Sequence, residues 1–429
     1  MPYRGRLAKL YLHLTFLLWL CLWLIWLGIS PVAAQAGAAE LGREGVRQTP
    51  LWLEQLGTWR GLAALKDKVA ALEAEYRENL KVKGIYIPGK LVPSAAFPRL
   101  VELVEQTELN AVVIDVKGDE GYLYFDTELP LVEEIGAERV VLRQAEELLA
   151  DLAARGIYTI ARLVVFKDTQ LGQAKPEWAI QDAAGRPWRD RSGQIWMNPY
   201  NEQVWAYNLA VARAAAALGF KEIQFDYVRF PSDGPVGQAR YPGRDQRAKS
   251  VVIAQFLARA REELSLYGVY VSADIFGQVP SVPYDMGIGQ QWELLAGTVD
   301  FLSPMVYPSH YAPGVYGLPD PDADPYRTVL RTVQDAFARY EQLLAAGLPE
   351  RLTARLGEVP EELVVTRREQ LAAVRPWLQD FTLRHPYGPA EVRAQIEAAY
   401  QAGADQWLLW NPNGNYSESA LQPAQQPPD

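Results

Sequence analysis

Cysteine and histidine are almost absent from this chain of 429 residues, which has one cysteine and three histidines. The cysteine, Cys21, lies in an apolar run near the N-terminus, so a chain without that run has no thiol for a disulfide, a thiolate nucleophile or a cysteine-ligated zinc ion. His13 belongs to the same N-terminal segment, which leaves His310 and His385. Two histidines are too few for a three-histidine metal centre and give little from which to build a Ser-His-Asp triad.

The first 36 residues indicate a secretory signal. Three basic residues precede the apolar run LTFLLWLCLWLIWLGI, and a small-x-small cleavage site ends at Ala36. The run is also nearly long enough to span a membrane, so an uncleaved anchor through residues 10–29 is the alternative. Either outcome predicts that the rest of the chain is exported, whether secreted, periplasmic or anchored outside the cytoplasm at the cell envelope.

Positive charge is also scarce, with 42 Lys and Arg against 52 Asp and Glu and a formal net charge of −10. Residues 1–36 carry three positive charges and no acidic residue, so their removal would take the net charge to −13. A nucleic-acid partner requires a basic face, and this balance argues against one. An acidic chain with 13 Trp and 22 Tyr suits neutral or cationic ligands better.

The composition divides the chain into four segments. Residues 1–36 are the signal or anchor, and residues 37–82 contain a linker and an amphipathic helix, in which apolar residues recur every three to four positions of GLAALKDKVAALEAEYRENL. Residues 83–415 form the main domain. Residues 416–429 are rich in Pro and Gln and are predicted to be a disordered tail.

Short apolar runs alternate with helical segments through the main domain. The candidate strands are residues 84–88, 111–117, 157–166, 222–230, 268–276, 300–307, 374–381 and 406–412. Apolar strands that alternate with helices are typical of a parallel sheet covered on both faces, and eight such units predict an α/β fold, the (β/α)₈ TIM barrel. A doubly wound open sheet is the main alternative. No G-x-G-x-x-G follows the first strand, so dinucleotide binding has no support.

Carboxylates interrupt the ends of four of these strands. These carboxylates are Asp115, Asp226, Asp274 and Asp380. Active sites of TIM barrels lie at the C-terminal ends of the strands, so the position itself is informative. A ring of structural ion pairs with Lys117 and Arg229 is one explanation, although such a network gains little over an apolar core. Acid/base catalysis on a sugar is the other, because glycoside hydrolysis uses one protonated and one ionised carboxyl group.

Asp226 and Asp274 are the predicted catalytic pair, because adjacent parallel strands lie about 5 Å apart and could place the two side chains on either side of a glycosidic oxygen. Asp226 is assigned as nucleophile or charge stabiliser and Asp274 as proton donor, and the reverse assignment stays open. Ile223 and Phe225, in the strand that leads to Asp226, are expected to fill the interior of the barrel.

Aromatic and polar residues near the same strand ends are the predicted sugar-binding surface, since an apolar ring face beside a polar edge suits a sugar. The predicted substrate-binding residues are Asp115, Lys117, Trp196, Tyr227, Arg229, Tyr307, His310, Asp380 and Trp410. The spacing of Asp115, Asp119 and Glu120 in DVKGDEG does not follow the EF-hand loop, so no metal site is predicted, and no cofactor.

Six segments occur in the order AVVIDVKGDEG, ARLVVFKD, WMNPYN, GFKEIQFDYVRFPSDG, SADIFG and SPMVYPSHY, within Lys83 to Asn415. They resemble, in this order, the segments of the bacterial putative glycoside hydrolase domain family, exported (β/α)₈ proteins distantly similar to the α-amylase family. The resemblance implies a glycosidase barrel with Asp226 as nucleophile and Asp274 as acid. It differs from the amylases in two places: Asp274 is Asp rather than Glu, and Gln224 stands where the amylases have an Arg.

The sequence therefore predicts an exported glycoside hydrolase that cleaves a polysaccharide or a cell-wall glycan such as that of peptidoglycan. A non-catalytic glycan-binding protein of the cell envelope, on a glycosidase scaffold, is the second hypothesis, because a fold does not determine a function. A deacetylase or lyase with a metal bound by carboxylates is the third, and a bound ion at Asp115 would support it. The sugar, the linkage, the choice between retention and inversion and the oligomeric state stay open.

Overall fold

The computed structural model describes residues 79–356 and 359–424. The predicted signal or anchor (residues 1–36) and all but the last residues of the predicted linker and helix (residues 37–82) lie outside this range. Within the range, no helix is both long enough and apolar enough to cross a membrane.

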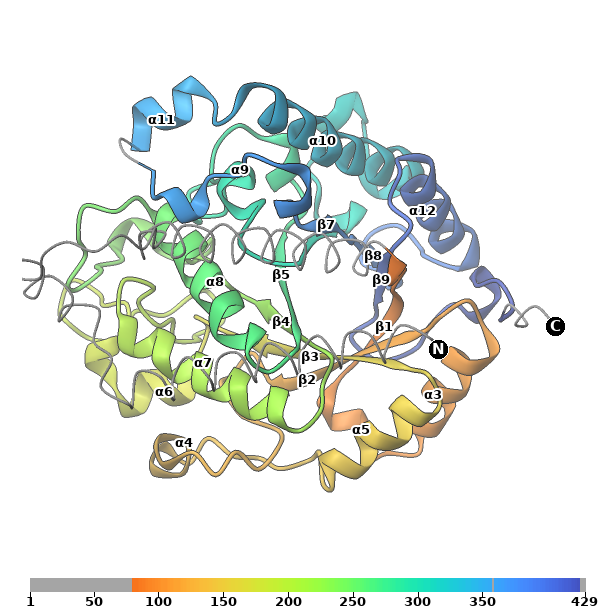
Figure 1. Ribbon diagram of the computed structural model, residues 1–429, viewed down its shortest axis with the longest axis horizontal. Helices are drawn as coiled ribbons and strands as arrows, with labels where there is room; N and C mark the ends of the chain where they lie inside the picture. Colours follow the sequence, from red (N-terminus) through yellow and green to blue (C-terminus); the bar gives the residue numbers. More distant parts are fainter. Residues whose placement is uncertain (1–78, 357–358, 425–429) are drawn as a thin grey trace, which may run out of the picture. The chain divides into compact units, whose positions relative to one another are not determined.

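A closed barrel of parallel strands forms the centre of the domain (Figure 1). The strands are β1 (Lys83–Ile87), β2 (Ala111–Lys117), β3 (Tyr158–Val164), β4 (Glu222–Asp226), β5 (Tyr270–Phe276), β6 (Phe301–Val306), β7 (Ala373–Val374), β8 (Trp377–Gln379) and β9 (Trp407–Trp410). Strand β1 pairs with β2 and β9, and β5 pairs with β4 and β6, so the sheet closes on itself. The predicted TIM barrel is thus confirmed, and the open sheet is excluded.

Two strands differ from their predicted extents. The run predicted over residues 374–381 is split into β7 and β8, which both pair with β6 and share one position in the barrel. Pro376 lies between them and has no N–H to donate to a ladder. The run predicted over residues 222–230 ends at Asp226, because Tyr227 turns the chain with a φ of 48°.

Helices cover the outside of the barrel (Figure 1). They are α3 (Ala96–Gln106), α4 (Pro130–Ile135), α5 (Ala145–Ala154), α6 (Thr169–Ala174), α7 (Glu202–Ala217), α8 (Lys249–Ser265), α9 (Trp292–Leu295), α10 (Pro325–Ala346), α11 (Glu350–Leu356) and α12 (Pro389–Gln401). Side-chain caps begin several of them: Asn201 accepts a hydrogen bond from an amide in the first turn of α7, and Asp324 does so for α10. Such caps satisfy amides that have no partner within the helix.

Alternate residues of each strand face opposite sides of the barrel wall. Ile223 and Phe225 belong to the apolar layer between the barrel and the helices, so the prediction that they fill the interior was wrong. The interior beside them is polar: Glu222 forms an ion pair with Arg375, and both side chains are fully buried. Tyr158 and Ser272, on the strands either side of β4, donate hydrogen bonds to the same carboxylate. Asp226 is separated from Glu222 by an even number of positions along β4, so its side chain also faces inward.

Gly84 lies in β1 between side chains of both neighbouring strands. A Cβ at this position would lie 2.8 Å from Leu408 Cδ2 and 3.1 Å from Ala111 Cβ. We expect Gly84→Ala to lower the free energy of unfolding by about 1–3 kcal/mol, as overpacking does, in a denaturant titration. Gly237→Ala is the control, because a Cβ there meets no atom within 4 Å. Equal stabilities of the two variants would contradict this packing.

The predicted disordered tail, residues 416–429, is wrong for its first nine residues, which the structure describes. The Tyr416 hydroxyl donates a hydrogen bond to the carbonyl oxygen of Tyr86. The backbone N–H and the hydroxyl of Ser417 donate to the two carboxylate oxygens of Asp380, each over 2.8 Å. A short 3-10 helix, Glu418–Ala420, follows. These contacts hold the segment against the barrel, which its Pro and Gln content did not reveal.

Candidate active site

A cavity of about 1220 Å³ lies at the C-terminal ends of the barrel strands, the place where TIM barrels carry their active sites. Of the residues predicted for the site, those that line it are Asp115, Asp226, Tyr227, Arg229, Asp274, Tyr307, His310 and Trp410. Three predicted residues do not line it: Lys117, Trp196 and Asp380.

Lys117 points away from the cavity because β2 contains a register shift. Asp115 pairs with Arg162, whereas Lys117 pairs with Leu163, which belongs to the outer apolar layer. The irregularity moves Lys117 to the outside of the barrel, where its ammonium lies 2.6 Å from the Asp168 carboxylate with both side chains fully buried. Lys117 was predicted to bind substrate in the cleft, but it forms a structural ion pair outside it.

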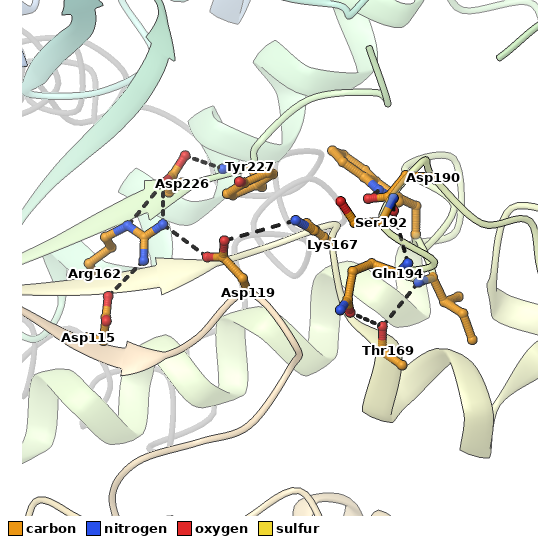
Figure 2. A network of polar contacts seen from close by, with 12 residues as sticks. Asp115, Asp119, Arg162, Lys167, Thr169, Asp190, Ser192, Gln194, Asp226 and Tyr227 are labelled. Atoms are coloured by element: carbon orange, nitrogen blue, oxygen red, sulfur yellow. Dashed lines mark hydrogen bonds and ion pairs between the residues drawn. The ribbon is translucent and has the colours of Figure 1, made fainter. Parts of the chain in front are cut away.

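Trp196 and Asp380 do not line the cavity, and each forms hydrogen bonds with other residues of the protein. The Trp196 side chain is 1% exposed, and its indole N–H donates to Asp190 over 3.0 Å. Asp190 also accepts hydrogen bonds from the backbone of the turn that contains Ser192, so it holds the loop after β3 in shape (Figure 2). Both carboxylate oxygens of Asp380 accept hydrogen bonds from Ser417. Both residues are thus positioned for structure rather than for contact with a ligand.

Arg162 is the centre of the charged network at the cavity floor (Figure 2). Its Nε and Nη2 donate to Asp226 Oδ2 over 3.0 and 2.6 Å, and its Nη1 donates to Asp115 Oδ1 over 2.7 Å. Nη2 also reaches Asp119 Oδ1 over 3.2 Å. Arg162 is the register partner of Gln224, so the neighbouring strand supplies the guanidinium that β4 itself lacks.

Arg162 was not among the residues predicted for the site, although the sequence contains one signal for it. It is a single charged residue in the apolar run IYTIARLVVF, and such a residue needs a partner when it is buried. The predicted partners of the carboxylates were Lys117 and Arg229, and neither forms an ion pair with Asp115 or Asp226. Burial alone would lower the pKa of Arg162, but Asp226 and Asp115 raise it well above its ordinary value. The guanidinium therefore stays charged.

Asp226 is bound by a guanidinium and by a backbone amide. Two charge-assisted hydrogen bonds from Arg162 reach Oδ2, and the backbone N–H of Tyr227 donates to Oδ1 over 2.6 Å. The positive φ of Tyr227 is a conformation that costs a residue with a side chain about 1–3 kcal/mol. That turn directs the amide toward the carboxylate.

Asp274 has a different environment. Its side chain is buried, and burial raises its pKa well above the ordinary value, with the Asp226 carboxylate raising it further. Arg162 and a hydrogen bond of 2.7 Å from the Trp377 indole to Oδ1 oppose the shift without cancelling it. Asp226 and Asp274 each lie one residue beyond the paired residues Phe225 and Ala273, so they are neighbours on adjacent strands. A carboxyl group bound by a guanidinium thus lies beside one whose pKa is raised.

An aromatic wall borders these carboxyl groups. The Trp410 ring stacks on Tyr86 with centroids 3.9 Å apart, and Tyr307 and Phe381 lie beside them. The Tyr86 hydroxyl donates to Asp115 over 2.5 Å, which fixes that ring. His310 lies on the same side, and burial lowers its pKa, so its imidazole is neutral near pH 7. The wall offers ring faces and neutral polar edges to a ligand.

The acidic cluster of the cavity does not have the arrangement of a metal site. Among the described residues, no group of three or more His, Cys, Asp or Glu side chains is placed to hold a metal ion. The two oxygens of Asp115 accept hydrogen bonds from Arg162 and Tyr86. A cation at this position would have to compete with the guanidinium.

The rate of any reaction that needs protonated Asp274 should fall as the pH rises through the raised pKa of this residue. Trp377→Phe removes a hydrogen bond that favours the ionised form, so it should move this fall in the profile of kcat/KM to higher pH. Tyr307→Phe keeps the indole and tests whether any change in the aromatic wall has the same effect. An unchanged or lower midpoint for Trp377→Phe would contradict the role of Asp274.

The closed parallel barrel and its paired carboxyl groups define a glycosidase-like domain. The family model described as "Putative glycosyl hydrolase domain" matches residues 84–416, and the chain belongs to this family. The resemblance inferred from the six sequence segments is thereby confirmed. A search of curated proteins found no match.

Three solved structures are similar to this chain, and the first of them shares its fold. The PgaB (BpsB) glycoside hydrolase domain from Bordetella bronchiseptica is 15% identical with a TM-score of 0.54, over 78% of this chain and 94% of that one. A hypothetical protein from Ruminiclostridium thermocellum ATCC 27405 is 38% identical with a TM-score of 0.40, over 44% of this chain and 96% of that one. Alpha-L-fucosidase isoenzyme 2 from Paenibacillus thiaminolyticus is 14% identical with a TM-score of 0.48, over 79% of this chain and 47% of that one.

Proposed function

We propose that this protein is a glycoside hydrolase that cleaves a polysaccharide or a cell-wall glycan, with Asp274 as proton donor and Asp226 as the ionised carboxylate. One observation carries the proposal: two neighbouring carboxyl groups, on β4 and β5, line one cavity, and one is bound by the Arg162 guanidinium while the other is buried with a raised pKa. Glycoside hydrolysis requires such a pair.

In this mechanism Asp274 gives its proton to the glycosidic oxygen as the bond from that oxygen to the anomeric carbon breaks. Asp226 attacks the anomeric carbon through one carboxylate oxygen and forms a glycosyl ester. Asp274, now ionised, takes a proton from a water molecule, which attacks the anomeric carbon and releases Asp226. This is the retaining course, for which the two carboxyl groups lie about 5–5.5 Å apart; in the inverting course they lie about 6.5–9.5 Å apart and Asp226 would activate a water molecule instead.

The size and lining of the cavity support a polymeric substrate. Its volume of about 1220 Å³ exceeds the range of about 300–1,000 Å³ typical of pockets for small ligands. Trp410, Tyr307 and Phe381 give it an apolar wall beside the carboxyl groups. The basic and apolar pattern of residues 1–36 supports action outside the cytoplasm, where such polymers occur.

The test is a screen of the purified protein against polysaccharides and peptidoglycan, with new reducing ends and product masses as the readout. Asp274→Asn is the matched control. We expect at least one glycan to be cleaved by the wild type and not by the variant, with the anomeric proton of the first product showing retention. Saturable binding without any cleavage would support a glycan-binding protein and contradict the proposal.

A further inference from the structure

The cations that line the cavity are not all neutralised. Arg162 is shared by three carboxylates, but none of the ion pairs among the described residues involves Lys90, Arg139 or Arg229, which also line the cavity. Arg162 carries one positive charge for the three carboxylates that it binds, and the lining as a whole has four cations and five carboxyl groups. Lys90, Arg139 and Arg229 therefore stand out through their lack of an ion-pair partner within the described part of the chain, not through the net charge of the cavity.

Arg229 is the most enclosed of these cations. The residue is 7% exposed, and its guanidinium carbon lies 4.8 Å from the ring centre of Trp196, 5.1 Å from that of Tyr227 and 4.6 Å from that of Phe276. Aromatic faces attract a cation and hold it in place, but they do not neutralise its charge. The Arg229 guanidinium is thus held in a fixed position in the wall of the cavity.

Only one nitrogen of Arg229 has a hydrogen bond within the described residues. Nη1 donates to the Phe230 carbonyl oxygen over 3.0 Å and to the Ser232 hydroxyl over 3.3 Å. Nε and Nη2 have no such partner, neither of them is fully buried, and the residue lines the cavity. A buried cation without a counter-ion is costly, and burial lowers the pKa of Arg229 accordingly. A carboxylate that accepts from this edge would offset the cost, since the planar guanidinium matches it in geometry and charge.

We propose that Arg229 forms a subsite for a carboxylate carried on a sugar ring, so that the glycan cleaved is acidic. The inference rests on the proposed function and names its substrate class. The carboxylate belongs either to a uronic acid or to a ketal-linked pyruvate. Arg229 packs on Phe276 at the end of β5, the strand of Asp274, so the charged sugar lies next to the reacting bond.

The acidic composition of the chain predicts neutral or cationic ligands, whereas the cations of the cavity that have no ion-pair partner among the described residues suit an anionic one. Besides Arg229, these cations are Lys90 and Arg139, whose guanidinium lies 3.3 Å from the ring centre of Tyr122. A carboxylate on the ligand would therefore be recognised by direct contact with these side chains, not by the net charge of the cavity.

The test measures binding by calorimetry in the Asp274→Asn background, which keeps the glycan intact. The ligands are oligouronates, pyruvylated oligosaccharides and the carboxyl-reduced form of each. We expect one acidic class to bind at least tenfold more tightly than its reduced form, and Arg229→Gln to remove the difference. Arg99→Gln, the same charge change on the exposed face of α3, should preserve it. Arg229→Lys should give an intermediate affinity, since an ammonium cannot bind in a bidentate manner.

Equal affinities for the acidic and the reduced ligands would overturn the inference, and this comparison needs no variant of Arg229. An equal loss of both affinities in Arg229→Gln would also overturn it, because that loss would indicate a structural role. Cleavage of neutral glycans without acidic preference would reject the acidic subsite and leave the proposed hydrolase. Acidic preference in binding, with no cleavage by the wild type, would reject the hydrolase and leave the subsite.

Discussion

Replacement of Asp226 or Asp274 by Asn is expected to lower kcat on a cleaved glycan by about a thousandfold or more, since each variant removes one of the two groups on which hydrolysis depends. The two losses of rate should depend differently on the leaving group of the substrate. Asp274→Asn should recover much of its rate on an aryl glycoside whose leaving group needs no protonation. Asp226→Asn should not, because no carboxylate remains to attack the anomeric carbon. Initial rates on both substrates measure the difference.

The stability of Asp274→Asn is a control, because the raised pKa of Asp274 predicts the direction in which this stability changes. Because the pKa of Asp274 is raised in the folded chain, the wild type loses stability as the pH rises above the ordinary range of an Asp. Asn at this position removes that loss, so Asp274→Asn should be at least as stable as the wild type at pH 7 in a denaturant titration. Full activity of either variant would contradict the assignment. Recovery of Asp226→Asn alone on the aryl glycoside would reverse it.

Arg162→Met is expected to lower the free energy of unfolding by about 3–5 kcal/mol, the cost of leaving buried charges without their partner. Three carboxylates share this guanidinium, and two of them, Asp115 and Asp226, are almost fully buried. Activity should fall by about a hundredfold or more, because Asp226 loses the guanidinium that holds its carboxylate in place. The loss of stability should become smaller at low pH, where the carboxylates are protonated.

Arg99→Met is the matched control for Arg162→Met, because it removes the same charge from an exposed position on α3. Its stability should stay within about 0.5 kcal/mol of the wild type, as for most surface substitutions. Denaturant titrations at pH 7 and pH 4 compare the two variants. Similar stabilities at pH 7, or a loss in Arg162→Met that does not depend on pH, would contradict the network.

The barrel could be predicted because its signal is repeated. Apolar runs of similar length alternate with helical segments along the chain, and one irregular unit does not change the pattern. The details that failed depend on single residues. Pro376 splits one strand, and Tyr227 ends another with a positive φ. Ile223 and Phe225 were assigned to the wrong face, since an apolar run does not show which side of a barrel wall is polar.

The site was predictable as far as strand position determines it. Asp226 and Asp274 lie at the cavity because they end two adjacent strands. Lys117 was misplaced because a register shift in β2 cannot be seen in the sequence. Asp380 was misplaced because its partner, Ser417, belongs to a segment whose composition suggests disorder. Arg162 was missed because its importance comes from carboxylates on other strands, which only the closed barrel brings to it.

The raised pKa of Asp274, on which its role as proton donor depends, can be measured directly. In the protein labelled with ¹³C at the aspartate carboxyl carbons, the signal of Asp274 can be followed by NMR from pH 3 to pH 9, with Asp274→Asn for its assignment. We expect Asp274 to titrate well above the ordinary value of about 3.9, because burial and the neighbouring Asp226 carboxylate raise its pKa. Titration of Asp274 at or below its ordinary value would contradict its assignment as the proton donor.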